Sequence, residues 1–336
     1  MPRVLVVGGG GREHALVRAL MRSPQKPELL AAPGNAGIAR DKVRCLDIDV
    51  EDVDTIVATA RDEGVDMVVV GPEAPLVRGV VDALADARVR AFGPSGAAAR
   101  IEGSKVYAKE LMAAVGVPTA GYAVFKTRAE ADEGLGRFSF PAVLKADGLA
   151  AGKGVLICRT EQEARAALDV FFGEERFGRT RVVLEEFLEG EELSLLALCD
   201  GERAIPMAPA QDYKRIFDGD EGPNTGGMGS YSPVPGIDAG HAEVLTRAVH
   251  QPIVDELRRR GTPFHGVLYA GLMMTVDGPR VLEFNARFGD PETQAVLPRL
   301  RSDLLDLLDR SVRFGGLEGA DLEWAPDWAV TVVLAS

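Results

Sequence analysis

The chain has 336 residues, 46% of them hydrophobic and 26% charged, and its formal net charge is −13. Such a composition is typical of soluble globular proteins, and the length suggests about two or three domains. The negative charge argues against nucleic acid and anionic membranes as partners, and no apolar run approaches the roughly 20 residues that cross a bilayer. Three widely separated cysteines indicate reduced thiols in a cytoplasmic protein.

The first hundred residues alternate short apolar strands with amphipathic helices. This alternation predicts an α/β domain with a parallel sheet and helices on both faces. A further helix is expected from about residue 103 to 115, with Ser104 as its N-cap. The other expected elements are strands over Val4–Val7, Met67–Val70 and Ala91–Pro94, and helices over Glu13–Arg22 and Val77–Ala87.

After residue 117 the pattern becomes that of an α+β region. The segment Gln211–Pro235 has little periodicity and is expected to be a long functional loop. The expected strands are Pro141–Lys145, Gly154–Cys158, Arg181–Glu185, Leu193–Cys199, Gly266–Val276, Arg280–Asn285 and one starting near Trp328; the expected helices are Glu161–Phe171, His241–Arg260 and Asp303–Arg313.

A run of glycines, Gly8–Gly11, follows the first strand and opens a helix, so its N–H groups are placed to hold a phosphate. Arg12 adds a charge-assisted donor. Glu13 stands where a dinucleotide fingerprint has its third glycine, so the match to that fingerprint is partial. A turn that only packs the helix on the strand is the alternative.

The segment Lys145–Gly154 connects two strands and differs from a Walker loop in its spacing. Three residues separate Gly148 from Gly152, and Gly154 replaces the Ser or Thr. The sequence predicts a hairpin tip that closes over a triphosphate, with Lys145 reaching the phosphates from the strand. A solvated hairpin without ligand is the alternative.

The acidic segment Leu184–Glu192 lies between two predicted lobes, where a nucleotide base is expected to bind. Glu185 is expected to accept a hydrogen bond from an exocyclic amine, and Glu192 from ribose hydroxyls. An acidic solvated loop is the alternative.

The segment Glu283–Arg287 continues a strand, so Glu283, Asn285 and Arg287 are expected on one face. A carboxylate and an amide oxygen side by side suit Mg²⁺, which takes its other ligands from phosphate and water. Arg287 would neutralise charge on a transferring phosphoryl group. An exposed polar strand face is the alternative.

Six motifs in this order resemble the ATP-grasp superfamily and, within it, the glycinamide ribonucleotide synthetase family. The resemblance implies an N-terminal doubly wound parallel-sheet domain followed by a two-lobed ATP-grasp domain, so the fold class combines α/β and α+β. The motifs are Gly10–Ala15, Ala32–Gly37, Val70–Leu76, Lys145–Gly154, Gly222–Gly229 and Glu283–Glu292.

The resemblance also implies a division of the chain. The expected parts are residues 1–103 as the N-terminal domain, 104–117 as a linking helix, 118–188 as a small lid lobe, 189–325 as the large lobe, and 326–336 as the start of a further C-terminal domain in a longer chain.

The activity that the resemblance implies is ligation of glycine to 5-phosphoribosylamine in purine biosynthesis, with ATP cleaved to ADP and phosphate. The cofactors implied are ATP and Mg²⁺ (or Mn²⁺), and the partners are small-molecule substrates only. The implied catalytic residues are Arg287, Lys145, Lys214 and Asp212. Glu283 and Asn285 are the implied metal ligands. The implied ATP-binding residues are Lys105, Lys145, Gly152, Lys153, Gly154, Glu185, Glu186, Phe187, Leu188 and Glu192, and the substrate-binding residues are Gly10, Gly11, Arg12, Glu13, Asn35, Glu73, Asp212, Asn224, Asp290 and Glu292.

Three other interpretations remain open from the residues. A sibling ATP-grasp ligase or carboxylase would share Lys145, Glu185 and Glu283–Arg287 but not the Gly71–Leu76 and Pro223–Gly229 segments. A dinucleotide-binding protein would use the glycine run and leave the second half unexplained. A chain that binds its ligands without turnover is the third.

Overall fold

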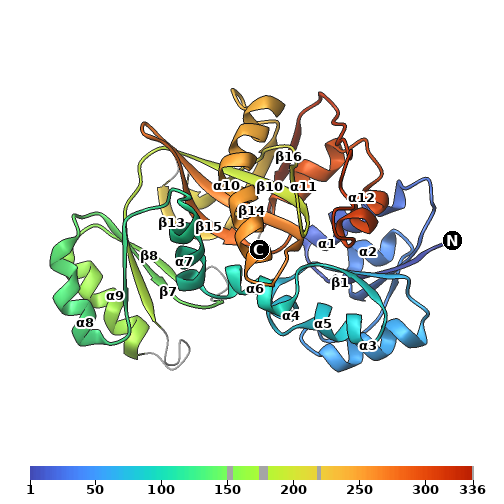
Figure 1. The fold of residues 1–336 in the computed structure, drawn as a ribbon, viewed down its shortest axis with the longest axis horizontal. Coiled ribbons are helices and arrows are strands. Elements are labelled where there is room, and N and C mark those ends of the chain that lie inside the picture. Colours follow the sequence, from blue (N-terminus) through green and yellow to red (C-terminus); the bar gives the residue numbers. More distant parts are fainter. Residues whose placement is uncertain (150–153, 174–180, 218–220, 335–336) are drawn as a thin grey trace.

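A computed structural model describes residues 1–149, 154–173, 181–217 and 221–334, and within 214–226 it describes the backbone alone. The molecule has three parts in a row (Figure 1). The N-terminal sheet lies at one end, a small lobe carrying α8 and α9 lies at the other, and the strands β10, β14 and β15 lie between them. Among the described residues, no helix is long and apolar enough to cross a membrane.

The N-terminal domain is the doubly wound parallel sheet that the sequence predicted, with strand order β3-β2-β1-β4-β5. Alternate residues of β1 point to opposite faces: Leu5 packs with α3 and α5, and Val6 packs with α1. The elements are β1 (Arg3–Gly8), α1 (Gly11–Met21), β2 (Glu28–Pro33), α2 (Ala36–Arg40), β3 (Arg44–Cys45), α3 (Val53–Asp62), β4 (Met67–Val70), α4 (Glu73–Val77), α5 (Val80–Asp86) and β5 (Arg90–Phe92).

The helix expected over Val77–Ala87 is two helices. Gly79, with φ of +84°, precedes α5 as its N-cap and breaks the helical path after α4. The first of these helices, α4, begins shortly after β4 and carries Glu73 in its first turn. A carboxylate at the carboxyl end of a parallel strand is well placed to face a ligand.

The lid lobe is an antiparallel sheet in the order β6-β9-β7-β8, with two helices on one face. Leu144 and Leu184 pack against Ala131 of α8 and Leu168 of α9. The opposite face of the sheet, with Lys145 and Glu185, turns to a cavity. The elements are β6 (Tyr122–Phe125), α8 (Arg128–Gly134), a 3₁₀ turn (Leu135–Arg137), β7 (Ala142–Ala146), β8 (Val155–Cys158), α9 (Glu161–Gly173) and β9 (Val182–Glu186).

Two helices, α6 (Gly96–Gly103) and α7 (Lys105–Val115), link the N-terminal domain to the lid lobe. Ser104 caps α7 as predicted, since its Oγ accepts a hydrogen bond from the Tyr107 N–H at 3.1 Å. The Asp147 carboxylate accepts from Ser104 Oγ at 2.9 Å and from Arg181 Nε at 2.9 Å. Asp147 therefore fixes the end of β7 to the start of α7.

The large lobe is an antiparallel sheet in the order β11-β10-β14-β15 between two helical layers. Leu195 of β10 packs with Val249 of α10 on one face, and Leu196 packs with Leu308 of α12 on the other. The elements are β10 (Glu191–Asp200), β11 (Ala204–Pro206), α10 (Ala239–Arg259), β14 (His265–Thr275), β15 (Gly278–Asn285), α11 (Glu292–Val296), a 3₁₀ turn (Leu297–Arg299) and α12 (Leu304–Ser311).

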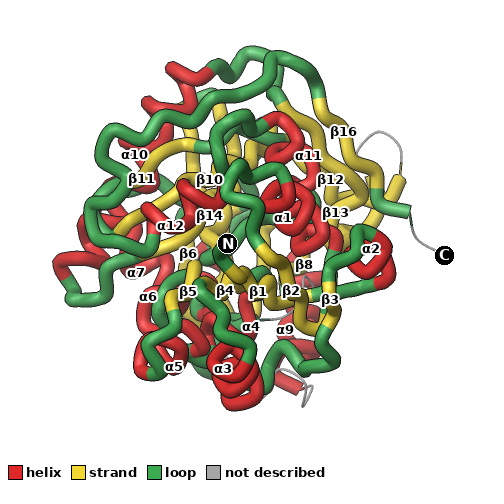
Figure 2. Tube along the Cα trace, turned by 90° about the vertical axis from the view of Figure 1, so that its right-hand side faces the viewer, coloured by secondary structure: helices red, strands yellow, loops and turns green. Residues whose placement is uncertain are grey.

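The expectation of a long loop over Gln211–Pro235 was wrong. The segment contains β12 (Gln211–Phe217) and β13 (Glu221–Ser232), which pair with each other, and β13 also pairs with β16 (Ala329–Val332). This sheet packs beside α11 at the edge of the molecule where the C-terminus leaves (Figure 2). Glycine, proline and asparagine weaken the strand pattern, so pairing with a distant strand decides the conformation.

We predict that Asp147→Asn destabilises the lid lobe by about 1–2 kcal/mol, because a buried carboxylate with charged and neutral donors loses its ion pair with Arg181. Urea denaturation monitored at the lid lobe measures the change. Asp169→Asn on α9 is the matched control, since its side chain is 69% exposed and its ion pair contributes little. Equal losses in the two variants would contradict the anchoring role of Asp147.

Candidate active site

A cavity of about 500 Å³ lies between the lid lobe, the α6–α7 linker, the edge of the large lobe and the N-terminal domain. Most of the side chains that the sequence predicted for the site line it, although they come from all parts of the chain. Those residues are Arg12, Glu73, Lys105, Lys145, Gly154, Glu185, Glu186, Phe187, Leu188, Glu192, Asp212, Glu283, Asn285, Arg287, Asp290 and Glu292.

Glu283, Asn285 and Arg287 all line the cavity, together with the neighbouring Leu282 and Phe284. The strand β15 ends at Asn285, so Arg287 lies just beyond it. The Arg287 guanidinium is 3.1 Å from Glu73 Oε2 and 3.1 Å from Glu102 Oε1. Burial lowers the pKa of Arg287, but the Glu102 and Glu73 carboxylates more than offset this, so its pKa is raised and its charge is fixed.

Glu102, at the end of α6, is a site residue that the sequence analysis missed. Its Oε2 accepts a hydrogen bond from the Ala286 N–H at 2.7 Å, so it holds the backbone beside Arg287 as well as its side chain. Burial raises the pKa of Glu102, and Arg287 opposes that rise. The only sequence signal was one carboxylate among the small residues of this helix.

Lys145 and Glu185 form a buried ion pair, with Lys145 Nζ 3.1 Å from Glu185 Oε2. Lys145 Nζ also donates to the Leu282 carbonyl at 2.9 Å, where a bulge interrupts the pairing of β15 with β14. A second lysine that the sequence analysis missed, Lys109, lies 3.1 Å from Glu185 Oε1. Glu185 is thus compensated by two lysines.

Lys105 Nζ donates to the Gly148 carbonyl at 2.9 Å and so contacts the base of the predicted phosphate hairpin. Burial lowers the pKa of Lys105. Lys105 and Lys145 both line the cavity and bring two cationic groups to the side nearest the hairpin.

From the inter-lobe segment, Glu186, Phe187, Leu188 and Glu192 line the same cavity, next to apolar side chains that the sequence analysis did not identify. Glu186 pairs with Arg280 at 3.1 Å across the two lobes. The apolar lining residues include Met112, Val143, Val155 and Ile157. Apolar walls with a few polar groups suit a flat ring such as a nucleobase.

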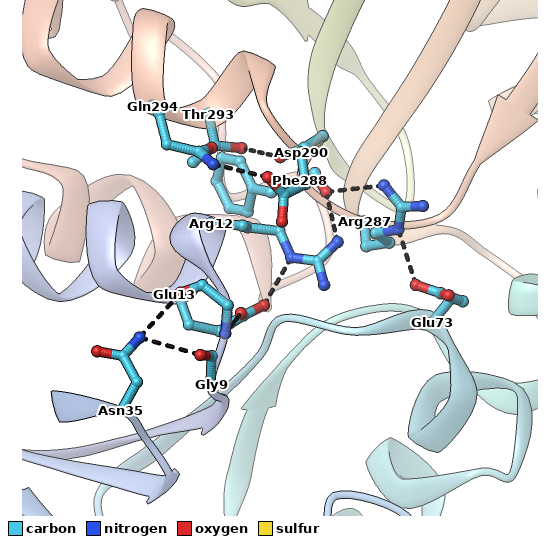
Figure 3. Close-up of polar contacts among 12 residues, drawn as sticks. Gly9, Arg12, Glu13, Asn35, Glu73, Arg287, Phe288, Asp290, Thr293 and Gln294 are labelled. Carbon is cyan, nitrogen blue, oxygen red and sulfur yellow. Dashed lines mark hydrogen bonds and ion pairs between the residues drawn. The ribbon is translucent and has the colours of Figure 1, made fainter. Parts of the chain in front are cut away.

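The glycine run is held by two predicted site residues that do not line the cavity (Figure 3). Glu13 Oε2 accepts from the Gly10 N–H at 2.7 Å, and Glu13 Oε1 accepts from Arg12 Nε at 2.6 Å. Asn35 Nδ2 donates to the Gly9 carbonyl at 2.9 Å. Arg12 itself lines the cavity, so Glu13 and Asn35 position the loop that presents Arg12.

Glu13 also explains the partial fingerprint. A Cβ at Gly71 would collide with Glu13 Oε1, and a Cβ at Gly8, where φ is +125°, would collide with the Glu13 side chain. The glycines therefore make room for a carboxylate of the chain itself.

Asp212 and Glu292 lie at the large-lobe end of the cavity and are both buried. Ser194 Oγ lies 3.3 Å from Asp212 Oδ1 and 3.1 Å from Glu292 Oε1, so its single proton is shared between the two carboxylates. The Tyr269 O–H donates to Glu292 Oε1 at 3.0 Å. Ser194 and Tyr269, which the sequence analysis missed, orient this pair of carboxylates.

Four predicted site residues cannot be placed. Gly152 and Lys153 lie outside the described residues, as do the side chains of Lys214 and Asn224. Gly10 and Gly11 lie next to Asp290 and the start of α11: a Cβ on Gly10 would lie 3.4 Å from Asp290 Oδ2, and one on Gly11 would lie 2.7 Å from Gln294 Nε2.

The donor set on β15 fits a hard divalent cation. Glu283 and Asn285 supply a carboxylate and an amide oxygen to the cavity, and Mg²⁺ is held by few protein oxygens when phosphate supplies others. In the part of the chain that the structure describes, no group of three or more His, Cys, Asp or Glu side chains is placed to hold a metal. A metal here would therefore depend on a phosphate-bearing ligand.

Comparison with known families gives two matches that together span most of the chain. Residues 2–102 match the phosphoribosylglycinamide synthetase N domain, and residues 103–293 match the phosphoribosylglycinamide synthetase ATP-grasp (A) domain. Curated proteins named phosphoribosylamine–glycine ligase are similar over 99% of this chain. The protein from Streptomyces coelicolor is 52% identical, with 78% of its length covered, and one from Xylella fastidiosa is 50% identical, also with 78% covered.

A crystal structure of phosphoribosylamine–glycine ligase from Thermotoga maritima is also similar, with a TM-score of 0.84 and 35% identity over 99% of this chain and 80% of that one. An ADP complex of N5-carboxyaminoimidazole ribonucleotide synthetase shares the fold, with a TM-score of 0.69 and 17% identity over 98% of this chain and 81% of that one. The ATP-grasp fold expected from the sequence is thus confirmed. The chain belongs to the phosphoribosylglycinamide synthetase family.

Proposed function

We propose that this chain ligates glycine to 5-phosphoribosylamine, cleaving ATP to ADP and phosphate through a glycyl phosphate intermediate. The observation that carries the proposal is the single cavity in which Lys105 and Lys145 from the linker and lid lobe meet Glu283 and Asn285 of β15. Lysines and metal-binding oxygens around one space are what phosphoryl transfer from ATP requires. The high identity to named phosphoribosylamine–glycine ligases supports the choice of substrates.

In this proposal ATP lies between the lobes. The adenine ring packs against the apolar side chains near the Glu185–Leu188 segment, with Glu185 accepting from its amino group and Phe187 and Leu188 contributing backbone groups. Glu192 accepts from the ribose hydroxyls. Lys105, Lys145 and the hairpin residues Gly152–Gly154 hold the phosphates, and closure of the hairpin excludes water from the acyl phosphate.

Glu283 and Asn285 would hold Mg²⁺ or Mn²⁺, which supplies charge neutralisation to the transferring phosphoryl group. Arg287 acts from the same side. Its position is set by Glu73 and Glu102 at 3.1 Å each, so the guanidinium is oriented before the substrate arrives. The glycine carboxylate attacks the γ-phosphorus, and positioning rather than a general base accelerates this step.

The acceptor subsites occupy the remaining wall. Asp212, Glu292 and Lys214 surround glycine and the transferring acyl group. Arg12, Glu73 and Asp290 face the phosphoribosylamine, and Asn224 contributes from the neighbouring strand. Gly10, Gly11, Glu13 and Asn35 form the loop that presents Arg12.

We also propose domain boundaries at residues 103, 117, 188 and 325. They are supported by the ends of the three main sheets and by the positions of α6 and α7 between the first two.

The first prediction concerns the substrates. Phosphate release from ATP is expected only when glycine, phosphoribosylamine and Mg²⁺ are all present, because the intermediate forms on glycine and is captured by the amine. A coupled phosphate assay with each component omitted in turn measures this. Equal release with bicarbonate in place of glycine would show that the chain is a carboxylating relative instead.

The second prediction concerns the metal. Glu283→Gln is expected to lower kcat/KM on the order of 100-fold and to weaken Mn²⁺ binding, because an amide replaces the one charged metal ligand. Steady-state kinetics and Mn²⁺ binding followed by electron paramagnetic resonance provide the two measurements. Glu243→Gln on the exposed face of α10 is the control. Unchanged Mn²⁺ affinity in Glu283→Gln would remove Glu283 from the metal site.

The third prediction concerns Glu102. Glu102→Gln is expected to lower kcat about tenfold with little change in ADP affinity, because Arg287 loses one of the two carboxylates that orient it. Rates at saturating substrates and ADP titration separate the two effects. Glu110→Gln, on an exposed position of α7, serves as control. A loss of ADP affinity without a fall in kcat would count against the role of Glu102 in placing Arg287.

A further inference from the structure

Lys109 of α7 is buried and forms an ion pair with Glu185 of the lid lobe. Only 2% of the residue is exposed, and its Nζ lies 3.1 Å from Glu185 Oε1 and 5.2 Å from the centre of the Tyr122 ring. Tyr122 pairs directly with Glu185 between β6 and β9, so ring and carboxylate share a sheet face. A buried ammonium is costly unless it is paired. The ion pair with Lys109 therefore fixes where the Glu185 carboxylate lies.

A hydrogen-bond chain ties the same ammonium to the large lobe. Lys109 Nζ donates to Thr119 Oγ1 at 2.7 Å, and Thr119 Oγ1 donates to the Val281 carbonyl at 2.6 Å. The Val281 N–H donates in turn to the Pro118 carbonyl at 2.8 Å. Lys109 is thereby held by β15 while it contacts β9.

The two lysines beside Glu185 differ in what else they can reach. Lys145 extends from β7 next to the predicted phosphate hairpin, whereas Lys109 is tied to Thr119. When Lys145 turns to a phosphate, Glu185 Oε2 is released toward the cavity and Lys109 remains as the counterion of Oε1. Burial lowers the pKa of Lys109 to about 8, so its ammonium form still predominates at pH 7.

We propose that Lys109 is a positioning residue for nucleotide selectivity: it holds the Glu185 carboxylate so that Oε2 accepts a hydrogen bond from the 6-amino group of adenine. The proposal rests on the proposed function, which places adenine against Glu185. A carboxylate fixed in this way favours a base with an amino group at position 6 and repels one with a carbonyl oxygen there.

The test compares the affinities of ADP and inosine diphosphate, measured by calorimetry with Mg²⁺. The wild-type chain is expected to bind ADP more tightly than inosine diphosphate. Lys109→Met is expected to reduce the ratio of the two affinities about tenfold, mainly by lowering the affinity for ADP. An unchanged ratio in Lys109→Met, or no preference in the wild type, would overturn the proposal.

Three further variants assign the effect to the charge of Lys109. Thr119→Val keeps the ammonium and its ion pair with Glu185 but removes one hydrogen bond that holds it, so it is expected to reduce the ratio less than Lys109→Met does. A loss equal to that of Lys109→Met would overturn the charge argument. Lys126→Met, at an exposed position of the lid lobe, is the matched control. In the Glu185→Gln background, where Lys109 has no carboxylate to hold, adding Lys109→Met is expected to change the ratio no further. A further tenfold change there would show that Lys109 acts independently of Glu185.

These binding measurements need neither glycine nor phosphoribosylamine. A wild-type chain without glycine-dependent phosphate release would disprove the proposed function, while the ADP preference and its loss in Lys109→Met would still decide the role of Lys109.

Discussion

Three parts of the chain meet at the Arg287 guanidinium. Glu73 reaches it from α4, Glu102 from the end of α6, and the guanidinium itself comes from just beyond β15. Because a buried charge without partners is strongly unfavourable, these contacts set how the N-terminal domain sits on the large lobe. The cavity is open between them, and its shape depends on this cluster. Removing Arg287 would leave the buried Glu102 carboxylate without its cation, whereas removing either carboxylate would leave Arg287 with a single partner.

The second charged cluster, around Glu185, positions the lid lobe against the large lobe on the other side of the cavity. There the lid lobe is tied to β15 through Lys109 and Lys145, by contacts to Thr119 and the Leu282 carbonyl. Both clusters converge on β15, which also carries the candidate metal ligands. The strand β15 thus sets where the N-terminal domain and the lid lobe lie relative to the candidate metal and phosphate sites.

Much of the fold could be predicted from local pattern, and the failures have physical causes. The parallel sheet and the long helix α10 were predictable because their apolar residues follow regular periods. The strands β12 and β13 were not, because β13 pairs with β16 about a hundred positions away and the pairing of β12 with β13 is irregular. Gly79 ended a helix whose apolar pattern continues through the break.

The candidate site shows the same division. Lys145, Glu283 and Asn285 could be found because they occupy strands beside glycine-rich or polar turns. Glu102 and Lys109 could not, since both are charged residues within ordinary helices, and their importance appears only when a partner from a distant segment lies 3.1 Å away. A periodic pattern gives the face of a helix but not the identity of what it faces.

The side chain of Glu13 gives the glycine loop a built-in anion. Its carboxylate already accepts from the Gly10 N–H and from Arg12, which are groups that a pyrophosphate would otherwise use at the start of such a helix. A dinucleotide would have to displace a buried carboxylate and meet its negative charge. The occupied Gly10 N–H argues against a dinucleotide at this loop, and Arg12 is the side chain of the loop that lines the cavity.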